Sequence, residues 1–176
     1  MDNSKILPGI TKIFFGLIYR DNEYYYKIID KLKNLAPIDI ESEEIPFDFT
    51  DYYKKEFGSN LMRKWVSIDK KIPENELVYL KQTSIGWEED LSFDQKRKVN
   101  CDPGGISLSR VILVTTKNYS HRIYMGNGIY SEITLIFKNK IFTPLEWTYP
   151  DYRNKTFINF ALKCREKLKS PSSKNI

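Results

Sequence analysis

The tripeptide Gly126-Asn127-Gly128 separates two apolar segments, residues 121–125 and 129–138. Asn-Gly between two such segments is the strongest short-range signal for a β-hairpin, because a two-residue type I′ turn needs positive φ at both central positions. Either Asn127-Gly128 or Gly126-Asn127 can occupy the turn. The sequence therefore predicts an antiparallel pair of strands over residues 121–138.

Other segments predict both strands and helices around this hairpin. Residues 13–19 form a nearly continuous apolar run that is typical of a buried strand, and residues 23–35 carry one apolar stripe at helical spacing. Pro73 is expected to open a helix that reaches about residue 91. Further strands are predicted at residues 38–45, 61–68, 99–105 (running into a turn at Pro103-Gly104) and 141–142, and a last helix at 156–168; residues 107–116 suit either a strand or a helix.

This order of elements predicts one α+β domain, a mostly antiparallel sheet with helices packed on one face. The domain is expected to span residues 1–176, with a core over about 10–169 and a frayed tail at 170–176. The 176 residues are enough to bury a core, with 41% hydrophobic side chains.

The composition of the chain limits the cellular compartments and the binding partners that can be expected. Cys101 and Cys164 lie far apart with no C-x-x-C pattern, and neither an apolar signal core nor eighteen consecutive apolar residues is present. These features predict a cytoplasmic protein without a membrane span. The formal charge of +5 comes from basic and acidic residues that are interleaved, with short basic runs only at 96–98 and 163–169. That pattern favours a solvated surface over a phosphate-binding stripe, and it leaves the oligomeric state open.

Several known chemistries lack their motifs. The chain has no Gly-x-x-x-x-Gly-Lys-Ser/Thr loop, no dinucleotide fingerprint and no Gly-x-Ser-x-Gly elbow. Its single histidine, His121, excludes a zinc site of ordinary ligands and two-histidine phosphoesterase chemistry. No cofactor and no metal are therefore expected.

Six groups of residues resemble, when taken together, a prokaryotic family known as domain of unknown function 4416. They are Phe47 to Tyr53, Asn100 with Asp102-Pro103-Gly104, Thr115-Thr116-Lys117, His121 to Tyr124, Gly128-Ile129-Tyr130 with Glu132, and Trp147 to Tyr152. The resemblance covers residues 13 to about 168. Gly105 departs from the family pattern, which more often carries an aromatic residue there. The resemblance implies no established activity, so the chemistry has to come from the residues.

His121 and Glu132 form the first candidate site. With a turn at Asn127-Gly128, His121 faces Thr134 and lies diagonal to Glu132; with a turn at Gly126-Asn127, it faces Glu132 directly. Either turn places imidazole and carboxylate on one face, with Arg122 on the other. A neighbouring carboxylate fixes the tautomer of an imidazole and favours its charged form, which suits a general base or an anion-binding group. The alternative interpretation is a structural contact at the sheet margin.

Loops that combine carboxylates and aromatic rings form the second candidate site. Helix capping explains Asp48, Asp51, Asp102 and Asp151 one by one, but together such carboxylates could hold a divalent cation. Five aromatic residues could stack on a base or a sugar, or could serve packing: Tyr52, Tyr53, Trp147, Tyr149 and Tyr152. Polar and aromatic residues concentrate in these loops, so we expect Tyr52 or Tyr53, Asp102, His121 and the turn at residues 149–152 to border one shared cleft.

Two functions follow as hypotheses. The first is a binding module for an anionic ligand, a nucleotide, RNA or sugar phosphate. Its ligand-binding residues would be Tyr52, Tyr53, Lys117, Arg122, Tyr149, Asp151 and Tyr152. The alternative is a small hydrolase- or transferase-like enzyme, with His121 and Glu132 as acid and base and with Asp102 assisting.

Overall fold

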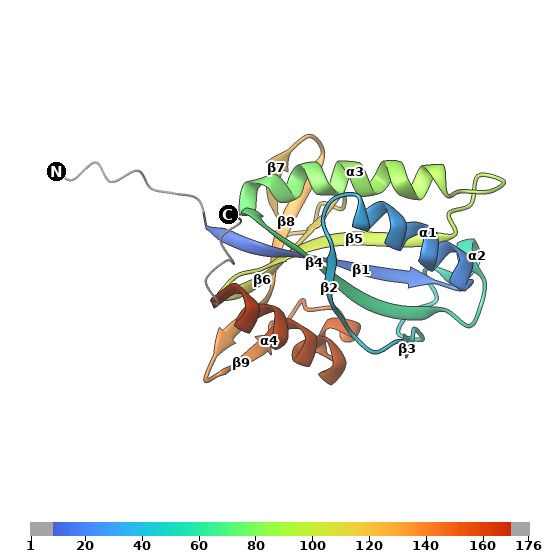
Figure 1. The fold of residues 1–176 in the computed structure, drawn as a ribbon. Helices are drawn as coiled ribbons and strands as arrows, with labels where there is room; N and C mark the ends of the chain where they lie inside the picture. The colour runs from blue at the N-terminus through green and yellow to red at the C-terminus, as the bar shows by residue number, and fades with distance from the viewer. Residues whose placement is uncertain (1–8, 170–176) are drawn as a thin grey trace.

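A computed structural model describes residues 9–169 as a single α+β domain on a nine-stranded antiparallel sheet (Figure 1). The main path of the sheet has the order β2-β4-β1-β5-β6-β8-β7, while β3 pairs with β4 and β9 with β8. The strands are β1 (Ile10–Tyr19), β2 (Ile38–Glu41), β3 (Ile45–Pro46), β4 (Met62–Pro73), β5 (Val99–Ile106), β6 (Arg110–Thr115), β7 (Ile123–Gly126), β8 (Ile129–Lys138) and β9 (Ile141–Pro144). The helices are α1 (Asn22–Lys33), α2 (Lys54–Phe57), η1 (Glu74–Glu76), α3 (Leu77–Asp90), η2 (Pro150–Arg153) and α4 (Lys155–Lys169). The predicted α+β class is confirmed, and the tail expected at 170–176 lies outside the described residues.

β1 is the central strand, paired with β4 on one side and β5 on the other. Every residue from Thr11 to Tyr19 is buried. Side chains alternate between the two faces of a strand, so a strand without a polar face needs cover on both sides. The continuous apolar run at residues 13–19 reflects this central position in the sheet, where both faces of β1 are covered.

The helices cover both faces of the sheet, which departs from the single helical layer expected from the sequence. α1 and α3 lie on one side and α4 on the other (Figure 1). Phe15 packs in the core beneath α1 and α3. Phe14 points the opposite way, with its ring centroid 5.5 Å from that of Phe157 and 6.0 Å from that of Phe160. Two neighbouring phenylalanines on opposite faces can both be buried only if each face has its own cover.

The predicted hairpin is confirmed, with Asn127 at φ 53° and Gly128 at φ 74° joining β7 to β8. Gly126 also has positive φ, 97°, and the pairing shifts by one residue between Tyr124 and Gly126. This bulge places residues of β7 one position away from the register that a regular two-residue turn would give.

Two other expectations differ from the structure around residue 104. The turn expected at Pro103-Gly104 is absent, because β5 continues through both residues to Ile106. Residues 110–115 form a strand, which resolves the ambiguity between strand and helix. At Gly105 a Cβ would lie 2.4 Å from the Thr11 hydroxyl oxygen, so this chain has no room for an aromatic side chain there unless Thr11 moves.

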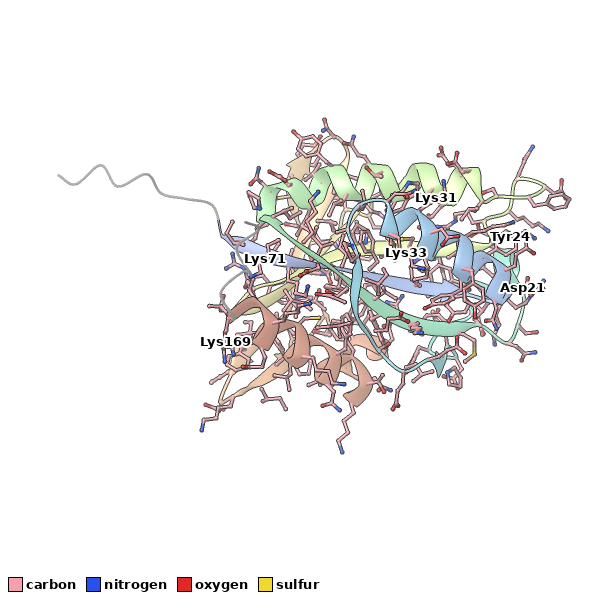
Figure 2. All side chains as sticks on the ribbon, in the orientation of Figure 1. Asp21, Tyr24, Lys31, Lys33, Lys71 and Lys169 are labelled. Atoms are coloured by element: carbon pink, nitrogen blue, oxygen red, sulfur yellow. The ribbon has the colours of Figure 1, made fainter. Side chains whose placement is uncertain are left out.

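Within residues 9–169 no helix is long and apolar enough to cross a membrane. Figure 2 labels lysines on several separate elements, with Lys31 and Lys33 on α1, Lys71 on β4 and Lys169 at the end of α4. The basic side chains are thus spread over the domain, as their interleaving with acidic residues in the sequence indicates.

Candidate functional site

A cavity of about 560 Å³ lies where β5 and β6 separate. The two strands pair only at Gly104–Leu113, Gly105–Ile112 and Ile106–Val111 within the described chain. Beyond these pairs, Asn100 and Asp102 of β5 and Val114 and Thr115 of β6 border the cavity. The cavity therefore occupies a place where the sheet has opened.

Two residues reduce the number of unpaired backbone donors where β5 separates from β6. Pro103 directly precedes Gly104, the first residue of β5 that pairs with β6, and has no N–H to satisfy. The N–H of Cys101 donates to Oε1 of Glu88 on α3, at 2.6 Å. Glu88 is buried, and burial followed by the charge of Asp102 raises the pKa of this carboxyl. The carboxyl thus takes the place of the missing strand partner.

Nine of the ten candidate site residues line this cavity, although they come from five separate parts of the chain. They are Tyr52, Tyr53, Asp102, Lys117, Arg122, Glu132, Tyr149, Asp151 and Tyr152. The tenth, His121, was expected at the same cleft, but it lies instead in an adjoining groove of about 340 Å³, which shares Glu132 with the cavity. The loops that the sequence singled out therefore converge, whereas their role in binding stays a prediction.

Arg63 of β4 forms part of the cavity floor, and the sequence analysis missed it. The side chain is 2% exposed, and its Nη2 lies 2.9 Å from Oδ2 of Asp151. The guanidinium carbon lies 4.9 Å from the ring centroid of Trp65 and 5.0 Å from that of Tyr152. Nε and Nη1 have no hydrogen-bond partner among residues 9–169. Arg63 is thus a buried cation with donor capacity that the protein itself does not use.

Gly16 provides the space for this guanidinium. A Cβ on Gly16 would lie 2.7 Å from the Tyr152 hydroxyl oxygen and 2.9 Å from Nη2 of Arg63. On β1, Gly16 stands between Trp65 of β4 and Asp102 of β5. The missing side chain leaves a depression in the sheet, and Arg63 and Tyr152 reach over it.

Asp102 lies beside this depression and is held by two donors. Nζ of Lys81 donates to Oδ1 at 2.7 Å, and Nδ2 of Asn100 donates to Oδ2 at 2.6 Å. Burial disfavours the charged form, but the Lys81 ammonium outweighs it, so the pKa of Asp102 is lowered. Conversely, burial raises the pKa of Asp151 despite the opposing charge of Arg63. The floor thus contains two basic and two acidic groups in adjacent pairs.

The rim of the cavity carries a different kind of cation. Nζ of Lys117 lies 4.2 Å from the ring centroid of Tyr52, which is 59% exposed. Among residues 9–169, Lys117 has no carboxylate within ion-pair distance, whereas Arg97 in the same wall is held by both Glu56 and Glu88. Among the basic side chains of the wall, Lys117 therefore carries a charge that no carboxylate of residues 9–169 compensates.

The guanidinium of Arg122 donates hydrogen bonds to three groups of the protein itself, and its orientation differs from the one expected. Its Nε donates to Oε2 of Glu132 at 2.7 Å, Nη1 to the carbonyl of Lys117 at 2.9 Å, and Nη2 to the Tyr149 hydroxyl at 2.8 Å. Arg122 was expected on the opposite sheet face from Glu132, and this prediction is wrong. The bulge next to Gly126 explains the difference: it pairs Ile123 with Ser131, so that the preceding residue, Arg122, is directed toward Glu132.

The predicted contact between His121 and Glu132 is present, with 3.0 Å between Nε2 and Oε2. His121 precedes β7, so its ring reaches Glu132 from outside the strand pair. The imidazole stacks on Trp147 with 5.1 Å between ring centroids. Glu132 also accepts from Thr134, so both carboxylate oxygens are occupied by protein donors. This arrangement resembles a structural junction more than an available base.

Other wall residues escaped the sequence analysis for identifiable reasons. Lys81 lies on the buried stripe of α3 with Leu77, Ser84 and Glu88, at helical spacing. Polar residues inside such a stripe were a usable signal. Arg63 alternates in step with Trp65, so it shares the buried face of its strand, which was a second signal.

The carboxylates do not gather into a metal site. Residues 9–169 contain no group of three or more His, Cys, Asp or Glu side chains placed to hold a cation. Asp102 pairs with Lys81 and Asp151 with Arg63, and Asp51 pairs with Lys54 on the surface. Capping does not account for Asp102 either, because it lies within a strand.

Comparison with family models gives one match, to the domain of unknown function DUF4416, over residues 10–168. The chain belongs to this family. Neither a search of curated proteins nor a search of solved structures finds a match. All six groups of residues that carry the DUF4416 resemblance contribute to the cavity wall, and the group Gly128-Ile129-Tyr130 with Glu132 does so through Glu132 alone.

Proposed function

We propose that this DUF4416 protein is a binding module for a small anionic ligand, which it receives in the cavity between β5 and β6. The observation that carries the proposal is Lys117, a half-buried ammonium at the rim without an ion-pair partner among residues 9–169. A cation in this position gains a charge-assisted hydrogen bond when a phosphate or carboxylate arrives.

The shape and lining of the cavity support a small molecule as the ligand. Its volume of about 560 Å³ falls within the range of roughly 300–1,000 Å³ that is usual for small-molecule sites. Aromatic rings make up much of the wall, from Phe47, Phe49, Tyr52, Tyr53, Tyr119, Tyr149 and Tyr152. Such rings offer flat apolar contact to a sugar or a base.

The geometry favours binding over the alternative enzyme with His121 and Glu132 as acid and base. His121 does not line the cavity; its Nε2 contacts Glu132 and its ring stacks on Trp147. Glu132 is buried and holds Arg122, so a proton transfer through it would disturb a structural ion pair.

A thermal-shift screen tests the proposal, with nucleotides, sugar phosphates, short RNA and inorganic phosphate as probes. A ligand at about 100 times its Kd stabilises the folded state by about 2.7 kcal/mol, which is easily detected. We expect Lys117→Met to weaken binding by roughly tenfold, the value of one charge-assisted hydrogen bond. The matched control is Lys138→Met, which removes the same charge from the β8–β9 hairpin, away from the cavity. Equal binding by both variants, or no binding by any probe, would refute the proposal.

We also propose a cytoplasmic location. Both cysteines are buried free thiols, which is usual for proteins of a reducing compartment. Fractionation of cells that express the protein would test this, and recovery outside the cytoplasm would contradict it.

A further inference from the structure

The cavity has two ends of different electrostatic character. At the floor, Arg63 pairs with Asp151, and Lys81 pairs with Asp102. At the rim, Lys117 has no carboxylate partner among residues 9–169. The floor is therefore charge-balanced, while the rim carries an uncompensated positive charge.

A phosphate group fits the rim better than the floor. At the floor it would lose its water beside two carboxylates, and their repulsion would offset the attraction of Arg63 and Lys81. At the rim it would meet Lys117 without an adjacent carboxylate partner and keep part of its hydration. The anionic part of the ligand therefore points outward.

The floor suits a neutral group that both donates and accepts hydrogen bonds. Arg63 offers two unpartnered nitrogens, and the Tyr152 hydroxyl is also buried without a hydrogen-bond partner in residues 9–169. Burial, followed by the charge of Asp102, raises the pKa of Tyr53, so this hydroxyl remains a donor as well. The carboxylates of Asp102 and Asp151 supply acceptors close by. A floor that offers both donors and acceptors suits the polar edge of a heteroaromatic base.

Aromatic side chains in the cavity wall give this group a place. The rings of Tyr53 and Tyr152 border the cavity, and the missing side chain of Gly16 leaves the room that the Arg63 guanidinium and the Tyr152 hydroxyl occupy. A flat ring can lie against aromatic side chains while its polar edge meets Arg63 and Tyr152. A sugar without a base would leave much of this aromatic surface unfilled.

Given the proposed function, on which this step rests, we infer that the ligand is a nucleoside monophosphate bound base first. The base lies on the floor beside Arg63 and Tyr152, and the phosphate lies at Lys117. Arg63 and Tyr152 then determine specificity for the base, and Lys117 determines the preference for a nucleotide over its nucleoside.

Titration calorimetry on the purified protein tests this orientation. The probes are the four ribonucleoside 5′-monophosphates, the matching nucleosides, ribose 5-phosphate and inorganic phosphate. We expect at least one monophosphate to bind, its nucleoside to bind roughly tenfold more weakly, and ribose 5-phosphate to bind more weakly than either.

Two variants separate the ends of the cavity. Lys117→Met should reduce the affinity for the monophosphate to that for the nucleoside, and leave the nucleoside itself unaffected. Tyr152→Phe should weaken both by the same factor, roughly threefold to tenfold, as one hydrogen bond would. Removing a hydroxyl that has no hydrogen-bond partner in residues 9–169 should leave the thermal midpoint unchanged, so a loss of binding is not a loss of folding. Tyr79→Phe is the matched control, because Tyr79 is exposed on α3 outside the cavity.

Three results would overturn the inference while leaving the proposed function intact. They are ribose 5-phosphate binding as tightly as the monophosphates, RNA binding where no mononucleotide does, and Tyr152→Phe changing the ratio of nucleotide to nucleoside affinity. If no phosphate-bearing probe binds at all, both the inference and the proposed function fail.

Discussion

Replacing Arg63 with methionine tests whether the floor of the cavity is a compensated ion pair. Methionine keeps much of the length of the side chain and its apolar character, but it removes the guanidinium, and with it the positive charge and the contacts with the rings of Trp65 and Tyr152. Asp151 would then remain in a site where its side chain is 8% exposed. An uncompensated buried carboxylate is strongly destabilising, because it loses its counter-charge while it stays largely out of water.

The expected loss of stability follows from this burial. Breaking a buried ion pair by removing one partner costs about 3–5 kcal/mol, and burial of both partners here leaves little solvent screening to reduce it. With a urea m-value of about 2 kcal/mol/M, that loss would lower the unfolding midpoint by roughly 1.5–2.5 M. Circular dichroism during urea titration at pH 7.5 measures the shift.

The loss should depend on pH with a definite sign. Burial already raises the pKa of Asp151, and Arg63 is the group that opposes this rise. Without Arg63 the pKa rises further, so the folded variant holds a proton that the unfolded chain, with a pKa of about 3.9, releases. That protonation stabilises the folded variant below the unfolded pKa, and the stabilisation disappears as pH rises through the folded pKa. Arg63→Met should therefore be closer to wild type at pH 5 than at pH 8.

The double variant Arg63→Met/Asp151→Asn is the control, since it removes both charges. It should recover stability to within about 2 kcal/mol of the wild type and lose most of the difference between pH 5 and pH 8. A single variant that loses less than about 1 kcal/mol at pH 7.5, or whose loss is independent of pH, would refute the ion-pair argument.

Three further measurements test other parts of the fold. Gly128→Val should lower the free energy of unfolding, measured by urea titration, by about 1–2 kcal/mol or more, because Gly128 has positive φ. Gly86→Ala is the control: it lies on α3 with no atom within 4 Å of the added Cβ, so it should be neutral or stabilising. Equal effects of the two variants would contradict the hairpin turn. Glu132→Ala should cost about 3–5 kcal/mol, because it leaves Arg122 buried without its carboxylate, and a cost below about 1 kcal/mol would reopen an acid-base role for Glu132. Burial raises the pKa of both thiols, that of Cys164 to about 12. A thiol reagent at pH 8 should therefore label Cys101 and Cys164 only when the protein unfolds. Rapid labelling of the native protein would argue against the buried core.

Local patterns in the sequence were sufficient for most of the elements. The apolar run at residues 13–19 predicted β1, the stripe at 23–35 predicted α1, and Asn127-Gly128 predicted the turn between β7 and β8. Each of these signals depends on neighbouring residues alone, through strand alternation, helical spacing or the φ angles of a turn. The convergence of the aromatic loops was also foreseeable, because polar and aromatic residues concentrate in them.

Register and layer order were not predictable in this way. The positive φ of Gly126 shifts the β7–β8 pairing by one residue, and that shift directs Arg122 toward Glu132. α4 carries an apolar stripe, and the face that it covers is formed by residues from several strands, among them Phe14 and Trp65. Such choices depend on contacts between segments far apart in the chain.

The charges of the site show most clearly the difference between what the sequence predicts and what the tertiary structure decides. The sequence alone identified Asp102, Asp151 and Lys117 as candidates, but it treated each as an isolated group. Only the tertiary structure pairs Asp102 with Lys81 and Asp151 with Arg63, and leaves Lys117 without a carboxylate partner among residues 9–169. The energy of a charge depends on burial and on the nearest opposite charge, and both are set by residues distant in sequence. The sequence thus indicated several of the groups that the cavity contains, and folding added Arg63 and Lys81 and determined which charges remain free to bind.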